Sequence, residues 1–139
     1  MNLYQHKVQY YETDQMGITH HSNYIRWMEE ARVDFLNQIG WGYKKMEAQG
    51  IISPVTAIES KYKVSTFFDD VITIAVWVEE FKGVKLKLAY EMHNEEGTLV
   101  FEAKSEHCFL DENRKVVSIR KTCPEFYEVV NQLIGVKGE

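Results

Sequence analysis

The clearest periodic pattern in the chain is a run of apolar residues spaced as one face of an α-helix. Apolar side chains recur every three or four residues after Tyr24, at Trp27, Met28, Ala31, Phe35, Leu36 and Ile39. This spacing matches a period of about 3.6 residues, so it predicts a helix that ends at Gly40 and can be capped by Ser22 or Asn23. The opposite face is expected to lie in solvent or in an interface, because its residues are charged: Arg26, Glu29, Glu30, Arg32 and Asp34.

Alternating and β-branched segments on both sides of this helix predict strands. One precedes the helix, at residues 3–11, and the others follow Gly50, at residues 51–64, 71–78, 85–92, 98–110 and, at an edge, 116–120. Short turns rich in Asp, Asn and Gly separate the later segments, so consecutive strands are expected to be antiparallel neighbours. Two shorter helices are expected at residues 43–49 and, after Pro124, at residues 125–134.

This order of elements predicts an α+β fold. One long amphipathic helix packed against one curved antiparallel sheet buries the apolar faces of both. Such a sheet has a free edge, so two copies of the chain are expected to pair edge to edge.

Composition and charge narrow the class of protein. The 139 residues correspond to about one domain, and 45% apolar with 27% charged residues is typical of a globular protein. We expect no membrane span and a cytoplasmic location, because the chain has neither an apolar run of helix-spanning length nor the pattern of a signal peptide. Cys108 and Cys123 lack metal or redox spacing and are expected to be reduced packing residues. The net charge of −5 argues against nucleic acid as a partner.

The densest cluster of polar residues lies at 11–24, between the first predicted strand and the long helix. Backbone N–H groups at a helix start carry about half a positive charge and can stabilise an oxyanion. Asp14 could therefore attack a carbonyl carbon or activate the water that does so, and His21 could donate a hydrogen bond or orient that water. The alternative is that Asp14 only forms an Asx-turn and that the histidines cap the helix or pack.

Other chemistries find little support in the sequence. Glycine-rich nucleotide loops and a Gly-x-Ser-x-Gly elbow are absent, and the adjacent histidines His20 and His21 lack the spacing of metal ligands. His6, His93 and His107 are isolated and are expected to be ordinary surface or core residues. Basic residues dot the sheet and flank the last strand. They favour solubility or could hold the phosphates of a small ligand, and the candidates are Lys63, Arg114, Arg120 and Lys121.

The segment from Val8 to Tyr24, with the sequence VQYYETDQMGITHHSNY, is followed by Glu30-Ala31-Arg32 and resembles the 4-hydroxybenzoyl-CoA thioesterase family. Further likeness lies at residues 59–63, 68–72 and 118–126, so it covers nearly the whole chain. Within the family, the chain is most similar to the acyl-CoA thioesterases associated with the Tol–Pal cluster, which carry a histidine at the position of His21.

The resemblance implies that residues 1–139 form a single hotdog thioesterase domain: a long helix wrapped by a curved antiparallel sheet of five to six strands, with a short C-terminal helix. It also implies a homodimer or a dimer of dimers with the active site at the interface. Asp14 matches the catalytic carboxylate, and His21 matches the residue whose backbone N–H polarises the thioester carbonyl. Gly17, Ser22 and Tyr24 fall in the same oxyanion and substrate-binding segment.

The implied substrate is a small acyl-CoA, whose phosphates would meet the basic candidates, and no metal or organic cofactor is expected. Gln15-Met16 and His20-His21 differ from the aryl-specific members, which favours an aliphatic acyl group. Two other functions stay open from the sequence. One is a non-catalytic module that binds acyl-CoA or acyl-carrier protein, and the other is a thioesterase acting on acyl-carrier protein.

Overall fold

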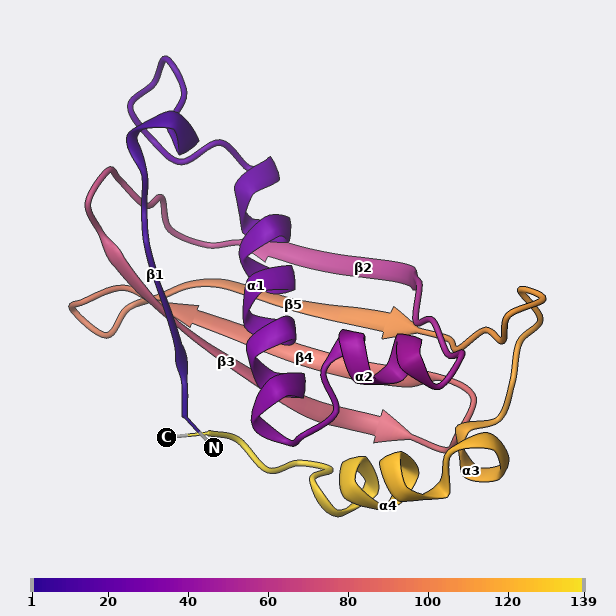
Figure 1. The fold of residues 1–139 in the computed structure, drawn as a ribbon. Coiled ribbons are helices and arrows are strands. Elements are labelled where there is room, and N and C mark those ends of the chain that lie inside the picture. The colour runs from indigo at the N-terminus through magenta and orange to yellow at the C-terminus, as the bar shows by residue number, and fades with distance from the viewer. Residues whose placement is uncertain (1, 139) are drawn as a thin grey trace.

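The computed structural model describes residues 2–138 and contains one five-stranded antiparallel sheet. Its strands lie in the order β1-β3-β4-β5-β2, so β1 and β2 form the two edges (Figure 1). The bounds are Tyr4–Lys7 for β1, Val55–Tyr62 for β2, Val71–Phe81 for β3, Leu86–His93 for β4 and Leu99–His107 for β5. The predicted antiparallel pairing of consecutive strands β3, β4 and β5 is confirmed. The same expectation is wrong for β2 and β3: β2 pairs with β5 at the opposite side of the sheet, because the segment between β2 and β3 crosses from one edge to the other instead of forming a tight hairpin turn.

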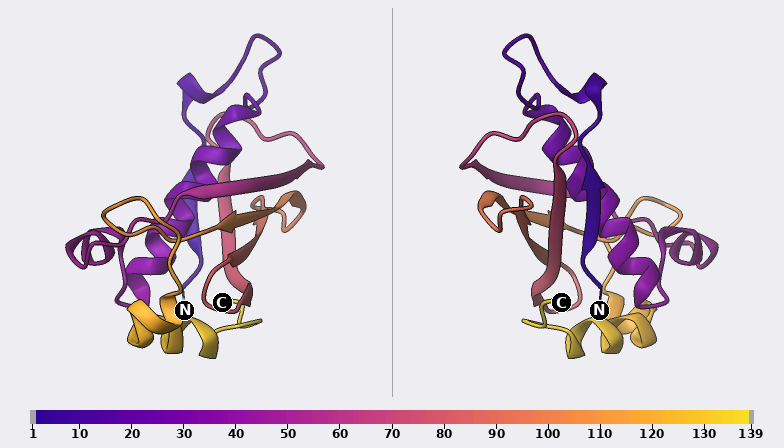
Figure 2. Two further views of the ribbon diagram at one scale, coloured as in Figure 1. Left: turned by 90° about the vertical axis from the view of Figure 1, so that its right-hand side faces the viewer. Right: turned by 90° about the vertical axis from the view of Figure 1, so that its left-hand side faces the viewer.

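Helix α1 (Ser22–Gln38) lies across one face of this sheet, as both side views in Figure 2 show. Its periodic apolar residues are buried against the sheet, as predicted, at Tyr24, Trp27, Met28, Ala31, Phe35 and Leu36. They meet the inward-facing residues of β3, β4 and β5 in one continuous core. The α+β architecture expected from the pattern is therefore confirmed.

Three short helices close the end of the core opposite the start of α1 (Figure 1). They are α2 (Tyr43–Ala48), α3 (Ile119–Thr122) and α4 (Pro124–Gln132). Phe126 of α4 packs against Trp41, Phe81 and Phe109, with ring centroids 5.3 to 6.2 Å apart. None of the helices in residues 2–138 combines the length and the apolar character needed to cross a bilayer.

Two of the predicted strands differ in the structure. The edge segment 116–120 makes only a single bridge, between Val116 and Leu110, and then turns into helix α3. The first strand ends at Lys7, and Tyr10–Glu12 form a 3₁₀-helix, η1. This turn forms because the Glu12 N–H donates to the Gln9 carbonyl while the Glu12 side chain accepts the Gln9 N–H, and alternation alone does not reveal such a local exchange.

The expectation that Arg32 lies in solvent or in an interface is wrong, because its side chain is buried. Its Nε donates to the hydroxyl of Tyr43 at 2.9 Å and its Nη1 to the hydroxyl of Tyr90 at 3.0 Å. These acceptors come from α2 and β4, so only the packing of distant segments makes the buried position tolerable for a cation.

Candidate functional site

The predicted catalytic carboxylate lies on a tight turn between η1 and α1. The backbone N–H of Asp14 donates to the carbonyl of Ile18 at 2.9 Å, and the backbone carbonyl of Asp14 accepts the N–H of Gly17 at 3.0 Å. Gly17 has a φ of 79°, a left-handed conformation that favours glycine, and it makes the sharp return of the chain possible. Asp14 Oδ1 accepts the Met16 N–H at 2.8 Å, whereas Oδ2 has no hydrogen-bond partner within residues 2–138. The Asx-turn and an available carboxylate oxygen therefore coexist.

The start of α1 is capped by a histidine, so the expected capping by Ser22 or Asn23 is wrong. His20 Nδ1 accepts the Ser22 N–H at 3.2 Å and lies 2.8 Å from the Ser22 hydroxyl. The ring of His21 is exposed and stacks on that of His20, with centroids 4.3 Å apart. In the described chain the backbone N–H of His21 donates to no acceptor. An uncommitted donor at the positive end of a 17-residue helix is suited to an oxyanion.

The turn and the helix start border one cavity of about 320 Å³. It brings together four of the residues predicted from the sequence: Asp14, His21, Tyr24 and Lys63. The rest of the lining is formed by Met16, Ile18, Thr19, Tyr62, Val64 and Ser65. Gly17 supports the turn without lining the cavity, and Ser22 faces a neighbouring hollow beside Tyr10 and Arg26.

Tyr24 forms a wall of this cavity. Its hydroxyl is 2.9 Å from Thr66 Oγ1, and its ring lies 4.9 Å from that of Phe101. Burial raises the pKa of Tyr24, so the phenol stays protonated at neutral pH. The sequence does not single out Thr66 or Tyr62, because their hydrogen-bond partners Tyr24 and His21 lie about 40 residues earlier in the chain.

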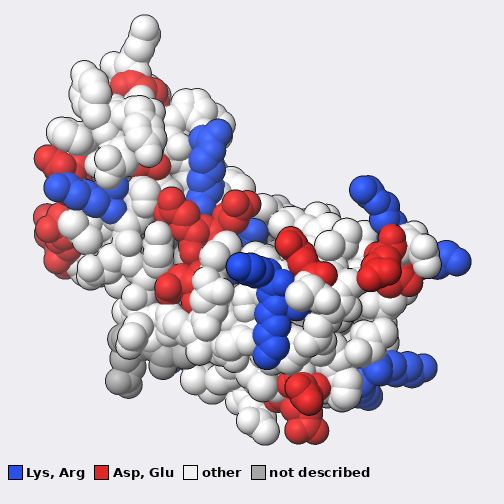
Figure 3. Space-filling view, viewed as in Figure 1, with Lys and Arg blue, Asp and Glu red and all other residues white. Residues whose placement is uncertain are grey.

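The candidate phosphate-binding residues are separated in a single chain. Lys63 lines the cavity and its Nζ lies 3.5 Å from Glu102 Oε1. Arg114 precedes α3 and Arg120 and Lys121 lie in it, at the end of the molecule away from the Asp14 turn (Figure 1). Figure 3 shows basic side chains projecting from that right-hand end. Arg120 donates to the hydroxyl of Tyr127 at 2.6 Å.

The part of the chain that the structure describes contains no candidate metal site. Among residues 2–138, no group of three or more His, Cys, Asp or Glu side chains is arranged to hold a metal ion. Cys108 and Cys123 are not joined in a disulfide, and Cys123 is buried as a packing residue.

Comparison with known families identifies the class of protein. Residues 8–131 match the model of the thioesterase-like superfamily. The match spans far more than half of the chain, so this protein belongs to the thioesterase-like superfamily. The hotdog fold implied by the sequence resemblance is confirmed by the sheet, the packing of α1 and the solved structures to which the chain is similar.

Several relatives are similar over most of their length. The putative acyl-CoA thioesterase YneP of Bacillus subtilis is 36% identical over 122 residues, covering 87% of this chain and 88% of that protein. A crystal structure of a DHNA-CoA thioesterase from Staphylococcus aureus has a TM-score of 0.90 at 33% identity and covers 94% of this chain and 89% of that chain. The acyl-CoA thioester hydrolase YbgC of Escherichia coli is 26% identical over 98 residues, covering 70% of this chain and 73% of that protein.

Proposed function

We propose that this chain is an enzyme that hydrolyses a small acyl-CoA thioester to a free acid and CoA. Asp14 acts as general base or nucleophile, and the backbone N–H of His21 at the start of α1 holds the carbonyl oxygen. The observation that carries the proposal is that Asp14, whose carboxylate has one uncommitted oxygen, and His21, whose backbone N–H is uncommitted, line the same cavity. The names of relatives such as YneP support the same reaction class.

The reaction needs few groups, because a thioester carbonyl lacks the resonance of an amide. In the general-base route, Asp14 takes a proton from water as the water oxygen attacks the carbonyl carbon. The negative charge that develops on the carbonyl oxygen is stabilised by the His21 N–H and the α1 dipole. The tetrahedral intermediate then collapses, the C–S bond breaks, and the sulfur of CoA receives the proton held by Asp14. In the nucleophilic route, Asp14 attacks the carbonyl carbon directly, the C–S bond breaks and CoA leaves as its thiolate. Water then hydrolyses the resulting mixed anhydride, which regenerates the Asp14 carboxylate and supplies the proton taken up by the CoA sulfur.

The acyl group is proposed to occupy the space between Ile18, Tyr24, Tyr62 and Val64. The hollow of about 320 Å³ is the part of this space that one copy of the chain contributes. A small aliphatic group agrees with the likeness to YbgC and with His21. An aryl group is the second candidate, because two tyrosine rings wall the cavity and the similar Staphylococcus aureus structure is named for DHNA-CoA.

A second copy of the chain is proposed to complete the site. β2 pairs only with β5 in the described structure, so its other side is an open edge. Apolar side chains beside that edge are exposed, including Ile58 at 39% and Tyr62 at 49%. Pairing two β2 strands antiparallel would satisfy the open backbone groups and cover these side chains.

Such a dimer accounts for the separated basic residues. In an antiparallel pair, the Tyr62 end of one β2 lies beside the Val55 end of the other. The loop carrying Arg114 and helix α3 lie at the Val55 end (Figure 1). The partner's Arg114, the partner's Arg120 and the partner's Lys121 would thus approach the cavity that holds Lys63. We propose that these four residues hold the phosphates of CoA across the interface.

The proposed function is tested by measuring thiol release from a panel of acyl-CoA esters, from short aliphatic to aryl. Wild type and Asp14→Asn are assayed side by side. The matched control is Asp34→Asn, because Asp34 also accepts a hydrogen bond on a carboxylate oxygen, from the Gln38 side chain, and does not line the cavity. We expect release by wild type and by the control, and at least a roughly hundredfold lower kcat for Asp14→Asn. An enzyme-only blank corrects for Cys108 and Cys123.

Two outcomes would overturn the proposal. Full activity of Asp14→Asn would exclude Asp14 as the catalytic carboxylate. Saturable binding of acyl-CoA without thiol release would indicate a binding module, and release only from matched acyl-carrier-protein thioesters would indicate the carrier-protein substrate instead.

A further inference from the structure

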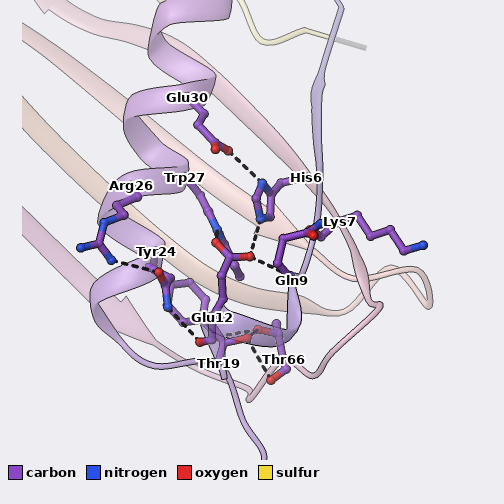
Figure 4. Close-up of polar contacts among 11 residues, drawn as sticks. His6, Lys7, Gln9, Glu12, Thr19, Tyr24, Arg26, Trp27, Glu30 and Thr66 are labelled. Atoms are coloured by element: carbon purple, nitrogen blue, oxygen red, sulfur yellow. Dashed lines mark hydrogen bonds and ion pairs between the residues drawn. The ribbon is translucent and has the colours of Figure 1, made fainter. Parts of the chain in front are cut away.

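A buried carboxylate outside the proposed mechanism lies two residues before Asp14. The side chain of Glu12 accepts three hydrogen bonds, each 2.8 Å long (Figure 4). Oε1 accepts from Nε2 of His6 and from the backbone N–H of Gln9, and Oε2 accepts from Nε1 of Trp27. The donors come from β1, from the residue before η1 and from α1, so one side chain joins three parts of the fold.

The backbone of Glu12 joins the two ends of the loop that carries Asp14. Its carbonyl oxygen accepts the N–H of His20 and the side-chain amide of Asn23, both at 2.8 Å. Between these ends, Thr13 and Thr19 form an antiparallel bridge. The loop therefore leaves Glu12 and returns to it, directly before His21.

His6 connects Glu12 to the surface of α1. Its Nδ1 lies 2.8 Å from Oε2 of Glu30, while its Nε2 faces Glu12 (Figure 4). Because ionised carboxylates only accept hydrogen bonds, the ring satisfies both partners when it is an imidazolium. Burial acts to raise the pKa of Glu12, but the hydrogen bonds from Gln9, His6 and Trp27 outweigh it and lower the pKa, so the carboxylate stays ionised.

We propose that Glu12 is a positioning residue for thioester hydrolysis: it fixes the distance and angle between the Asp14 carboxylate and the His21 N–H. Asp14 follows Glu12 by two residues, and His21 follows His20, which Glu12 binds. The positions of both reacting groups therefore depend on one buried residue, Glu12, which we call the anchor. His6 and Glu30 keep that anchor in place from β1 and α1. This inference rests on the function proposed above.

Glu12→Gln is the sharpest test, because it preserves shape and removes the anchor's chemistry. A glutamine amide has one acceptor oxygen and one donor nitrogen, so it cannot accept from His6, Gln9 and Trp27 together. In either orientation of the amide, its NH2 group faces a donor that it cannot bind, which is the N–H of Gln9 or that of Trp27. We expect kcat to fall by about 10- to 100-fold, with KM changed less than about threefold, because misplacement of a reacting group affects the chemical step.

Glu29→Gln is the matched control. Glu29 is exposed on α1, makes no hydrogen bond or ion pair within residues 2–138, and loses the same charge. We expect its kcat and KM to equal those of wild type. His6→Gln provides a second variant should Glu12→Gln fail to fold. The single amide nitrogen of glutamine cannot replace both ring nitrogens of His6, so one of the two carboxylate contacts is lost and a smaller fall in kcat, about three- to tenfold, is expected.

Amide hydrogen exchange separates this inference from the proposed function. In wild type the Asp14 and His20 N–H groups are bonded to the carbonyls of Ile18 and Glu12. We expect Glu12→Gln to accelerate exchange at these two amides and to leave amides in β3 and β4 protected. Should wild type release no thiol, the function fails while this measurement still tests the anchor.

The inference is overturned if Glu12→Gln keeps wild-type kcat. It is also overturned if exchange at Asp14 and His20 is unchanged, or if the loss of activity only follows the unfolded fraction seen in circular dichroism. If Glu12→Gln does not fold, the inference is overturned when His6→Gln keeps wild-type kcat and unchanged exchange at Asp14 and His20.

Discussion

The phenol of Tyr62 donates a hydrogen bond to the main-chain oxygen of His21, 3.1 Å away. Tyr62 is the last residue of edge strand β2, and His21 immediately precedes α1. The ring of Tyr62 also meets those of Tyr24 and Phe101 edge-on, at 5.2 and 5.1 Å. The open edge of the sheet and the start of the helix are therefore connected through one side chain beside the cavity.

Tyr62→Phe should weaken this connection while preserving the aromatic packing. A neutral hydrogen bond contributes about 1 kcal/mol, so kcat/KM is expected to fall by about fivefold. Steady-state thiol release measures the change. Tyr43→Phe is the control, because it removes a hydroxyl that accepts a hydrogen bond from Arg32, and neither residue lines the cavity. Equal effects of the two substitutions would show that the Tyr62–His21 contact has no special role.

Gly17→Ala should impair activity through the Asp14 turn. Gly17 has a φ of 79° and no atom within 4 Å of an added Cβ, so the cost is backbone strain of about 1 kcal/mol. Gly97 has a φ of 80° and equally open surroundings in the turn between β4 and β5, which makes Gly97→Ala a matched control. We expect both variants to lose similar stability in urea unfolding, and only Gly17→Ala to lose kcat. Wild-type kcat in Gly17→Ala would contradict this.

His107 should make the protein less stable in mild acid. Burial and the nearby Arg32 charge lower the pKa of His107 from 6.5 to about 4, so the ring stays neutral in the folded state. The unfolded chain takes up a proton as the pH falls through 6.5, while the folded chain does not until about pH 4. Protonation therefore favours unfolding, and this group alone removes roughly 2 kcal/mol of stability between pH 7 and pH 5.

Urea unfolding at pH 7 and pH 5 measures this contribution. His107→Gln should show a smaller loss of stability between the two pH values than wild type, although it is less stable at pH 7. His93→Gln, on β4 outside the buried network, should keep the wild-type pH dependence. A pH dependence in His107→Gln as steep as that of wild type would refute the assignment.

Periodicity predicted the main elements well, because it reflects which face of each element is buried. The apolar residues of α1 from Tyr24 to Leu36 are buried as expected, and β3 alternates between buried and more exposed residues. The pattern was less informative at the ends of elements. At residues 116–120 and 8–12, side-chain and turn hydrogen bonds determine the backbone, and these leave no periodic signal.

The buried polar groups show where sequence reasoning ends. The sequence pattern predicts Arg32 on the charged face of α1, and His6 and His107 as ordinary surface or core residues. In the structure, Arg32 donates to Tyr43 and Tyr90, and Ser105 lies 2.7 Å from both the Tyr90 hydroxyl and the His107 Nε2. A single sequence does not indicate which polar side chains find partners, because the partners lie up to 58 residues apart.

The order of residues alone predicts the α+β class, the face of α1 that packs on the sheet, the family resemblance and the position of Asp14 and His21 near a helix start. Local spacing is enough for these, because burial periodicity and short motifs are properties of neighbouring residues. Three relationships become visible only in the folded chain: Asp14 and His21 line one cavity, Tyr62 reaches His21, and Glu12 holds both ends of the Asp14 loop. These relationships require segments distant in the chain to pack together, and each depends on directional hydrogen bonds whose partners are chosen by the fold.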